Sequence, residues 1–189
     1  MTPSRHLRGQ VHLHTFREGL LSRLGHDLLL RVGEWSARLE GNSLELSVLP
    51  RSVQVVGCMR GGQVFENELS ASDRRKIEGS IRDSVLRSES HHSILFSGRV
   101  HDLSASRVEL KGELEIQGKR RPIDLRLPRD PDGVHADVEI APSNWGISPF
   151  RALGGALKVK DLVRIAARME LPADLTAQSL QDRVHTWQA

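Results

Sequence analysis

The segment LKGELEIQGKRRPIDLRL at residues 110–127 decides the fold class, because its apolar and polar residues alternate. Leucine, glycine and isoleucine hold one parity over 110–116, and the alternation resumes after Pro122. A period of two is typical of a β-strand with one buried face. Gly118 can adopt the positive φ of a turn, and proline is best tolerated at the start of a returning strand. The segment therefore predicts a β-hairpin with a turn over 118–122.

Short strand-like runs of the same kind recur along most of the chain, with turn residues between them. They lie at residues 11–16, 26–32, 35–39, 44–48, 53–55, 94–96, 134–140 and 163–169. An antiparallel sheet of this many strands either curls into a barrel or splits into a sandwich. We expect an all-β protein with one helix, built as an antiparallel, lipocalin-like β-barrel of about eight strands.

One segment follows a helical period instead. Apolar residues recur at every fourth position over 77–85, which places them on one face of a helix. Ser70 stands three residues before Asp73, an arrangement typical of an N-terminal cap. The sequence therefore predicts a single helix near 72–88.

Composition excludes several classes of function. The 27 basic and 24 acidic residues are interspersed and the net charge is +3, so no basic face for nucleic acid is predicted. Aromatic residues make up 4%, which leaves few platforms for stacking bases. Cys58 is the only cysteine, so neither an intrachain disulfide nor a multi-cysteine zinc site is expected. Because no apolar run suits a signal peptide or a membrane span, we expect a cytoplasmic protein.

Catalytic motifs are missing as well. The sequence holds no G-x-S-x-G elbow and no Walker A loop, so we assign no catalytic residue and expect a protein that is not an enzyme. We assign no cofactor and no metal ligand. Two alternatives stay open: an interaction module with a packed interior, and a metal site on the same barrel. The metal site would require several of the chain's histidines to converge, from the set His12, His14, His26, His91 and His92.

Four segments in a fixed order resemble those of a known family. They are VELKGELEIQGKRRPIDLRL at 108–127, IAPSNWGISPFRALGGALKVKDLVRIAARMEL at 140–171, LSRLGHDLLLRVGEW at 21–35 and HHSILFSGRV at 91–100. Over 9–171 the chain resembles the YceI-like family of polyisoprenoid-binding, lipocalin-like β-barrels, and 172–189 is left as a polar tail with a weak helical pattern. The resemblance implies a hydrophobic barrel tunnel that binds, carries or sequesters a long-chain isoprenoid or a similar amphiphilic lipid.

An apolar tail offers no hydrogen-bonding groups, so its binding free energy must come from removing the tail from water. Aliphatic walls suffice for such a ligand. The candidates are inward-facing residues of the strands, together with the rings that flank the segment 146–149. We predict that the ligand contacts Leu28, Leu30, Trp35, Phe96, Leu114, Ile116, Leu125, Trp145, Ile147 and Phe150.

Basic residues crowd the tip of the predicted hairpin. Lys119, Arg120 and Arg121 would face solvent there, and a positive tip attracts anionic lipid headgroups. We therefore predict transient contact with a membrane surface, and no contact with nucleic acid. Nothing in the sequence sets the oligomeric state.

Overall fold

The computed structural model describes residues 4–18, 26–155 and 157–171, which are mostly β-structure. The strands are β1 (Ser4–His6), β2 (Arg8–Glu18), β3 (Asp27–Val32), β4 (Trp35–Glu40), β5 (Ser43–Val48), β6 (Val53–Arg60), β7 (Gln63–Phe65), β8 (Ile94–Leu103), β9 (Arg107–Ile116), β10 (Lys119–Asp130), β11 (Gly133–Ile140), β12 (Arg151–Ala152) and β13 (Leu157–Glu170). The α-helix α1 (Ala71–Ser80) runs directly into a π-helical turn, η4 (Ile81–Val85). Short 3-10 turns are η2 (Pro50–Ser52), η3 (Glu66–Glu68), η5 (Pro142–Trp145) and η6 (Leu153–Gly155).

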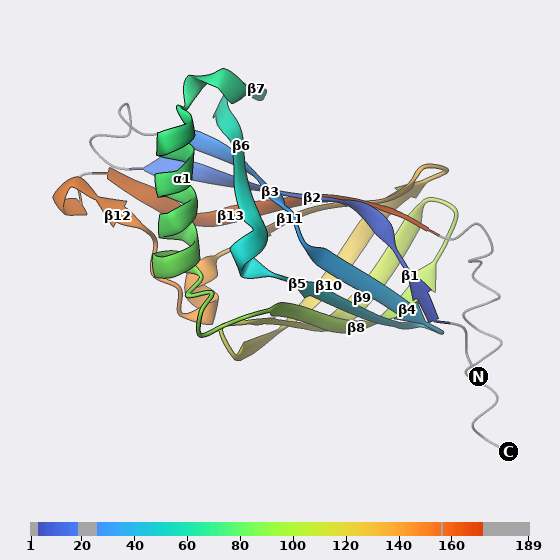
Figure 1. The fold of residues 1–189 in the computed structure, drawn as a ribbon. Helices are drawn as coiled ribbons and strands as arrows, with labels where there is room; N and C mark the ends of the chain where they lie inside the picture. Colours follow the sequence, from blue (N-terminus) through green and yellow to red (C-terminus); the bar gives the residue numbers. More distant parts are fainter. Residues whose placement is uncertain (1–3, 19–25, 156, 172–189) are drawn as a thin grey trace, which may run out of the picture.

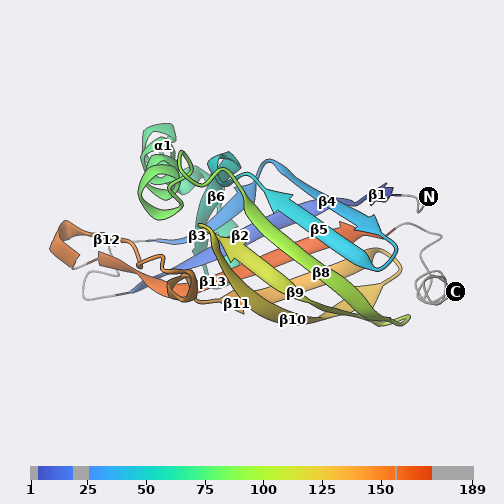
Figure 2. The ribbon, with the colours of Figure 1, turned by 90° about the horizontal axis from the view of Figure 1, so that it is seen from below.

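The strands form one antiparallel sheet that curls into a half-barrel (Figures 1 and 2). Its order is β1-β4-β5-β8-β9-β10-β11-β13-β2-β3-β6-β7, with β12 paired to β13, which makes 13 strands among the described residues. The helix stands over one end of the half-barrel, next to β6 (Figure 1). The predicted mostly antiparallel β-fold with one helix is confirmed, whereas the predicted barrel of about eight strands is wrong.

Three interruptions of the backbone contribute to the higher strand count. Leu7 separates β1 from β2, residues 33–34 separate β3 from β4, and the turn η2 separates β5 from β6. Pro50 in η2 has no N–H to give to a ladder, so the chain bends there. The two parts of each run then pair with different neighbours: β3 pairs with β2 and β6, whereas β4 pairs with β1 and β5.

The hairpin of β9 and β10 turns through two residues, Gln117 and Gly118. Both have positive φ, 51° and 74°, as expected for a two-residue turn that matches the twist of its strands. The predicted turn over 118–122 is therefore wrong. Pairing already begins opposite Ile116, so residues 119–121 belong to β10 rather than to a free tip.

Side chains of the inward parity fill the middle of the half-barrel. The Phe96 ring, in a residue only 8% exposed, lies over Gly98 and Gly112, which face each other across β8 and β9. A Cβ atom on Gly112 would lie 2.9 Å from this ring and 2.4 Å from the Ser97 carbonyl oxygen. The glycine in the alternating segment is therefore a packing requirement. The buried cluster around it is Ala37, Leu39, Leu44, Phe96, Val100, Leu103, Val108, Leu110, Leu114, Ile116, Leu127, Val134, Trp145 and Ile147.

The helix begins where the sequence predicts. The Ser70 hydroxyl accepts a hydrogen bond from the Asp73 amide at 3.1 Å and donates one to the Asp73 carboxylate at 2.7 Å. These bonds confirm the predicted cap. The α-helix ends at Ser80, and the π-helical turn ends at Val85, so the helical segment stops before the predicted residue 88.

Two side chains of α1 fasten the helix to the edge of β6. Glu78 Oε1 accepts a hydrogen bond from the Val55 amide at 2.8 Å, and Arg74 Nη1 donates one to the Val55 carbonyl oxygen at 3.4 Å. We call this pair of contacts the Val55 clamp. It satisfies both backbone groups of Val55 without another strand. The apolar side of the helix, with Ile77 and Ile81, packs against the buried cluster of β3 and β6.

Among the described residues, no helix is both long enough and apolar enough to cross a membrane. The predicted polar tail at 172–189 lies outside the described residues.

We expect Gly112→Ala to lower the free energy of unfolding by about 1–3 kcal/mol, because adding volume to a filled core forces its neighbours apart. Urea unfolding followed by circular dichroism measures the change. Glu113→Ala lies on the solvent face of the same strand and should change stability by no more than about 0.5 kcal/mol. Wild-type stability in Gly112→Ala would contradict the close packing of Phe96 on this residue.

Candidate ligand-binding site

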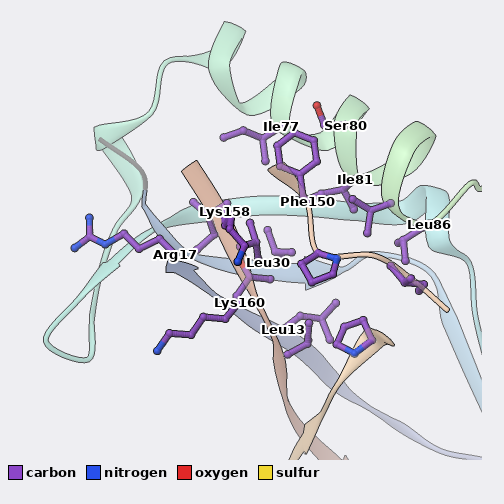
Figure 3. Close-up of a pocket in the computed structure, with 18 of the residues that line it drawn as sticks. Leu13, Arg17, Leu30, Ile77, Ser80, Ile81, Leu86, Phe150, Lys158 and Lys160 are labelled. Atoms are coloured by element: carbon purple, nitrogen blue, oxygen red, sulfur yellow. The ribbon is translucent and has the colours of Figure 1, made fainter. Parts of the chain in front are cut away.

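A pocket of about 390 Å³ lies between α1 and one end of the half-barrel. Figure 3 shows Ile77 and Ile81 of the helical segment, and Leu86 directly after it, around the same space as Leu13 and Leu30 of the sheet. The third side comes from the chain after η5 and from β13. The apolar lining is mainly Leu13, Leu28, Leu30, Val53, Ile77, Ile81, Val85, Leu86, Ile147, Pro149, Phe150, Leu157, Val159 and Val163.

Phe150 marks the mouth of the pocket. Its side chain belongs to a residue that is 36% exposed, and the ring lies toward the helix near Ile77 and Ile81 (Figure 3). Lys76 and Lys160 also line the pocket and are exposed, so the space opens to solvent at this side. An exposed ring at the rim of an apolar cavity offers contact area to a guest.

The predicted contact residues fall into two groups. Leu28, Leu30, Ile147 and Phe150 line the pocket. The others belong to the buried cluster of the half-barrel or pack against it: Trp35, Phe96, Leu114, Ile116, Leu125 and Trp145. At those positions the half-barrel is filled by its own side chains. The pocket therefore lies under the helix at one end of the sheet.

The predicted contact residues include none from two walls of the pocket, the helical segment and β13. The regular spacing of Ile77 and Ile81 predicts a helix, and the same apolar face signals a surface that needs a partner. The sequence of β13 has no comparable pattern that would predict its contribution to the pocket. Its register shifts between Val159 and Val163, and such an irregularity depends on pairing with the distant strand β2.

The β9–β10 hairpin positions the helical wall of the pocket and the segment that follows η5. The Gln117 side-chain amide donates a hydrogen bond to the Val85 carbonyl oxygen at 2.8 Å, which holds the end of the π-helical turn. Trp145 Nε1 donates one to the Leu114 carbonyl oxygen at 2.9 Å. This buried bond fixes η5 just before Ile147 enters the pocket wall.

Basic side chains gather at the mouth. Lys158 and Lys160 of β13 lie on the same side of the pocket as Arg17 of β2 (Figure 3). Arg17 pairs with Val159, which lies between the two lysines, so the three residues are close along the paired strands. Arg17 Nε is 3.8 Å from the Asp27 carboxylate. Within the part of the chain that the structure describes, Lys158 and Lys160 have no ion-pair partner.

The strand histidines lie away from the pocket. His12 and His14 alternate with inward residues of β2 and so face outward. His14 Nδ1 is 3.1 Å from Met59 Sδ. Partial burial lowers the pKa of His14, and the charge of Arg164 adds to this effect. The neutral imidazole is therefore favoured at this position.

His26 lies in a different environment from the strand histidines. Its ring lies near the Cys58 thiol and the Glu68 carboxylate, with one ligand atom of each residue within 4.8 Å of the others. Burial raises the pKa of the Cys58 thiol, while the charges of Arg60 and Arg74 oppose this shift. The thiol is thus predominantly protonated near neutral pH when no cation is bound.

The basic residues near the hairpin turn make internal contacts. Arg120 Nε donates a hydrogen bond to the Glu115 carboxylate at 2.7 Å, and Arg121 Nε donates one to the Asn144 carbonyl oxygen at 3.1 Å. Both arginines remain exposed. Membrane contact through this surface stays a prediction.

The chain belongs to the YceI-like family, because the model of the YceI-like domain matches residues 30–171. The match confirms the resemblance seen in the sequence. No curated protein matches the sequence significantly.

Solved structures share the fold at low sequence identity. A polyisoprenoid-binding domain from Saccharophagus degradans, implicated in plant cell wall breakdown, is 12% identical, with a TM-score of 0.63 over 91% of this chain and 100% of that one. BcnA from Burkholderia cenocepacia is 9% identical, with a TM-score of 0.60 over 87% of this chain and 96% of its own. What these proteins share with this chain at such identities is the fold.

We expect Trp145→Phe to lower the free energy of unfolding by about 1–3 kcal/mol, because the buried hydrogen bond from the indole to the Leu114 carbonyl oxygen is lost. Urea unfolding gives the value. Trp35→Phe is the matched control, since Trp35 packs against the same cluster and its indole nitrogen has no hydrogen-bond partner among the described residues. Equal losses in the two variants would show that the indole hydrogen bond adds nothing to stability.

Proposed function

We propose that this protein binds the apolar tail of a long-chain isoprenoid or a similar amphiphilic lipid, without catalysis, and thereby carries or sequesters it. The observation that carries the proposal is the pocket of about 390 Å³ under α1, whose walls are mainly apolar. Sites for small molecules are typically about 300–1,000 Å³ and mostly apolar. The fold shared with a polyisoprenoid-binding domain supports an isoprenoid as the ligand.

The volume sets how much of a ligand the pocket covers. It equals roughly 13 water molecules at ~30 Å³ each, and a methylene group is similar in size. A segment of about a dozen carbon atoms therefore fits, and a longer chain extends past the mouth. Burying ten methylene groups contributes about 8 kcal/mol before the costs of association and chain ordering. That gain is enough to support binding without any hydrogen bond to the tail.

The mouth favours an acidic or phosphorylated headgroup. Lys158 and Lys160 lie where the tail would leave the pocket, and neither is neutralised by an ion pair within the described ranges. Asp161 is the acidic residue of the lining, but its carboxylate already accepts hydrogen bonds from the amide and hydroxyl of Ser143. An anionic headgroup at this place would gain Coulomb attraction from two lysines.

We expect Ile81→Asp to weaken farnesol binding at least about tenfold, which corresponds to about 1.4 kcal/mol, because an apolar tail cannot satisfy the carboxylate that the substitution places in the pocket wall. Displacement of the fluorescent probe N-phenyl-1-naphthylamine measures the affinity. Ser84→Asp adds the same charge to the exposed side of the same turn and should bind as the wild type does. Organic extraction of the purified protein followed by mass spectrometry gives an independent readout. Failure of the wild type both to bind farnesol and to retain any apolar compound would overturn the proposal.

We expect Lys158→Gln/Lys160→Gln to weaken binding of farnesyl phosphate by about threefold to tenfold at low ionic strength and to leave farnesol binding unchanged, since the two ligands share the apolar tail and only the first carries an anionic phosphate. The same displacement assay applies, and added salt should shrink the difference. Lys111→Gln, an exposed lysine on β9, controls for the loss of positive charge. An equal change for both ligands would refute electrostatic selection at the mouth.

A further inference from the structure

Cys58, His26 and Glu68 converge from three places in the sequence. Cys58 lies on β6, His26 immediately precedes β3, and Glu68 ends η3. Cys58 is fully buried, and it pairs with Leu28 across the sheet, which brings the start of β3 alongside it. One sulfur, one ring nitrogen and one carboxylate oxygen from the three residues all lie within 4.8 Å of one another.

Gly57 allows the η3 segment to come this close. A Cβ atom on Gly57 would lie 2.7 Å from the Phe65 carbonyl oxygen and 2.9 Å from the Glu66 Cα atom. The chain after β7 therefore lies directly on β6, where any larger residue would push it away. This close approach places Glu68 beside Cys58.

Arg60 orients the carboxylate of this cluster. Its guanidinium forms an ion pair with Glu68, and its central carbon lies 5.2 Å from the centroid of the Phe65 ring. The ring and the ion pair together restrain both side chains. Outer partners that hold a ligand carboxylate in place are characteristic of metal sites in proteins.

We propose that His26, Cys58 and Glu68 bind a divalent transition-metal ion of the zinc class. Imidazole, thiolate and carboxylate are the protein ligands of zinc, at about 2.0–2.3 Å, so two ligand atoms of a tetrahedral site stand about 3.5 Å apart. The ligand atoms, already within 4.8 Å of one another, would have to approach by up to about 1.3 Å to reach that separation. The thiolate selects against magnesium and calcium, which prefer oxygen ligands.

Three protein ligands leave one coordination position for water or for a group of a bound molecule. His26 also lines the apolar pocket, so the cation would lie at its wall. On binding, the Cys58 thiol releases its proton to solvent and the sulfur becomes the ligand. The site rests on the side chains of the protein alone and does not depend on lipid binding.

Cobalt titration of the tag-free, chelator-treated full chain tests the site. We expect one equivalent of Co²⁺ to produce the near-ultraviolet charge-transfer absorption of a cobalt–thiolate bond and the visible bands of tetrahedral cobalt. Zinc should displace the cobalt, and magnesium should not. His26→Ala and Glu68→Gln, which leave the buried thiol in place, should each weaken zinc binding at least about tenfold in isothermal titration calorimetry. His101→Ala, an exposed histidine on β8, is the matched control and should bind as the wild type does.

Two results would overturn the site. The first is a folded wild-type protein that gives no thiolate band at one equivalent of Co²⁺, including the case in which the metal binds through histidines elsewhere. The second is unchanged zinc affinity in both His26→Ala and Glu68→Gln, with circular dichroism showing that the variants are folded. Neither result bears on farnesol binding, so the metal site and the lipid pocket are tested separately.

Discussion

The Val55 clamp is the contact on which the pocket depends. Because Glu78 and Arg74 bind the amide and carbonyl groups of Val55, α1 is fixed at the edge of β6 and reaches over the end of the half-barrel. Its apolar side then faces the sheet across a space that no side chain of the sheet fills completely. At the far end of the helical segment, the bond from Gln117 to Val85 fixes the position of the π-helical turn. The shape of the site thus follows from a few hydrogen bonds at its borders.

Alternation in the sequence identifies inward residues, but it does not show what fills the interior. Leu28 and Leu114 both follow the inward parity, yet Leu28 lines the pocket and Leu114 lies in the buried cluster. The difference depends on which element, distant in the sequence, packs over each residue. The turn η5 bonds its Trp145 indole to the Leu114 carbonyl group, whereas the helix stays above Leu28. Strand parity, the Ser70 cap and the ordered family segments were predictable, because each depends on residues close together in the chain.

Local sequence patterns also failed to predict the strand count and the cluster of His26, Cys58 and Glu68. A bend such as the one at Pro50 changes which neighbour each half of a run pairs with, and local periodicity does not record that choice. In the sequence, the lone cysteine has no activating group beside it, so a packed thiol is the natural interpretation. Only the close approach at Gly57 and the pairing of β3 with β6 bring the other two side chains to it.

The clamp also affects how copies of the protein meet. An unpaired β-edge is a template on which a strand of another molecule can add. At Val55, both groups that such a strand would need are already bonded to the helix, and farther along the same edge β7 pairs with residues 58–60. A strand of another molecule would have to displace the helix contacts and β7 before it could extend the sheet. This edge of the half-barrel is therefore protected against growth into intermolecular sheets, an ordinary route to aggregation.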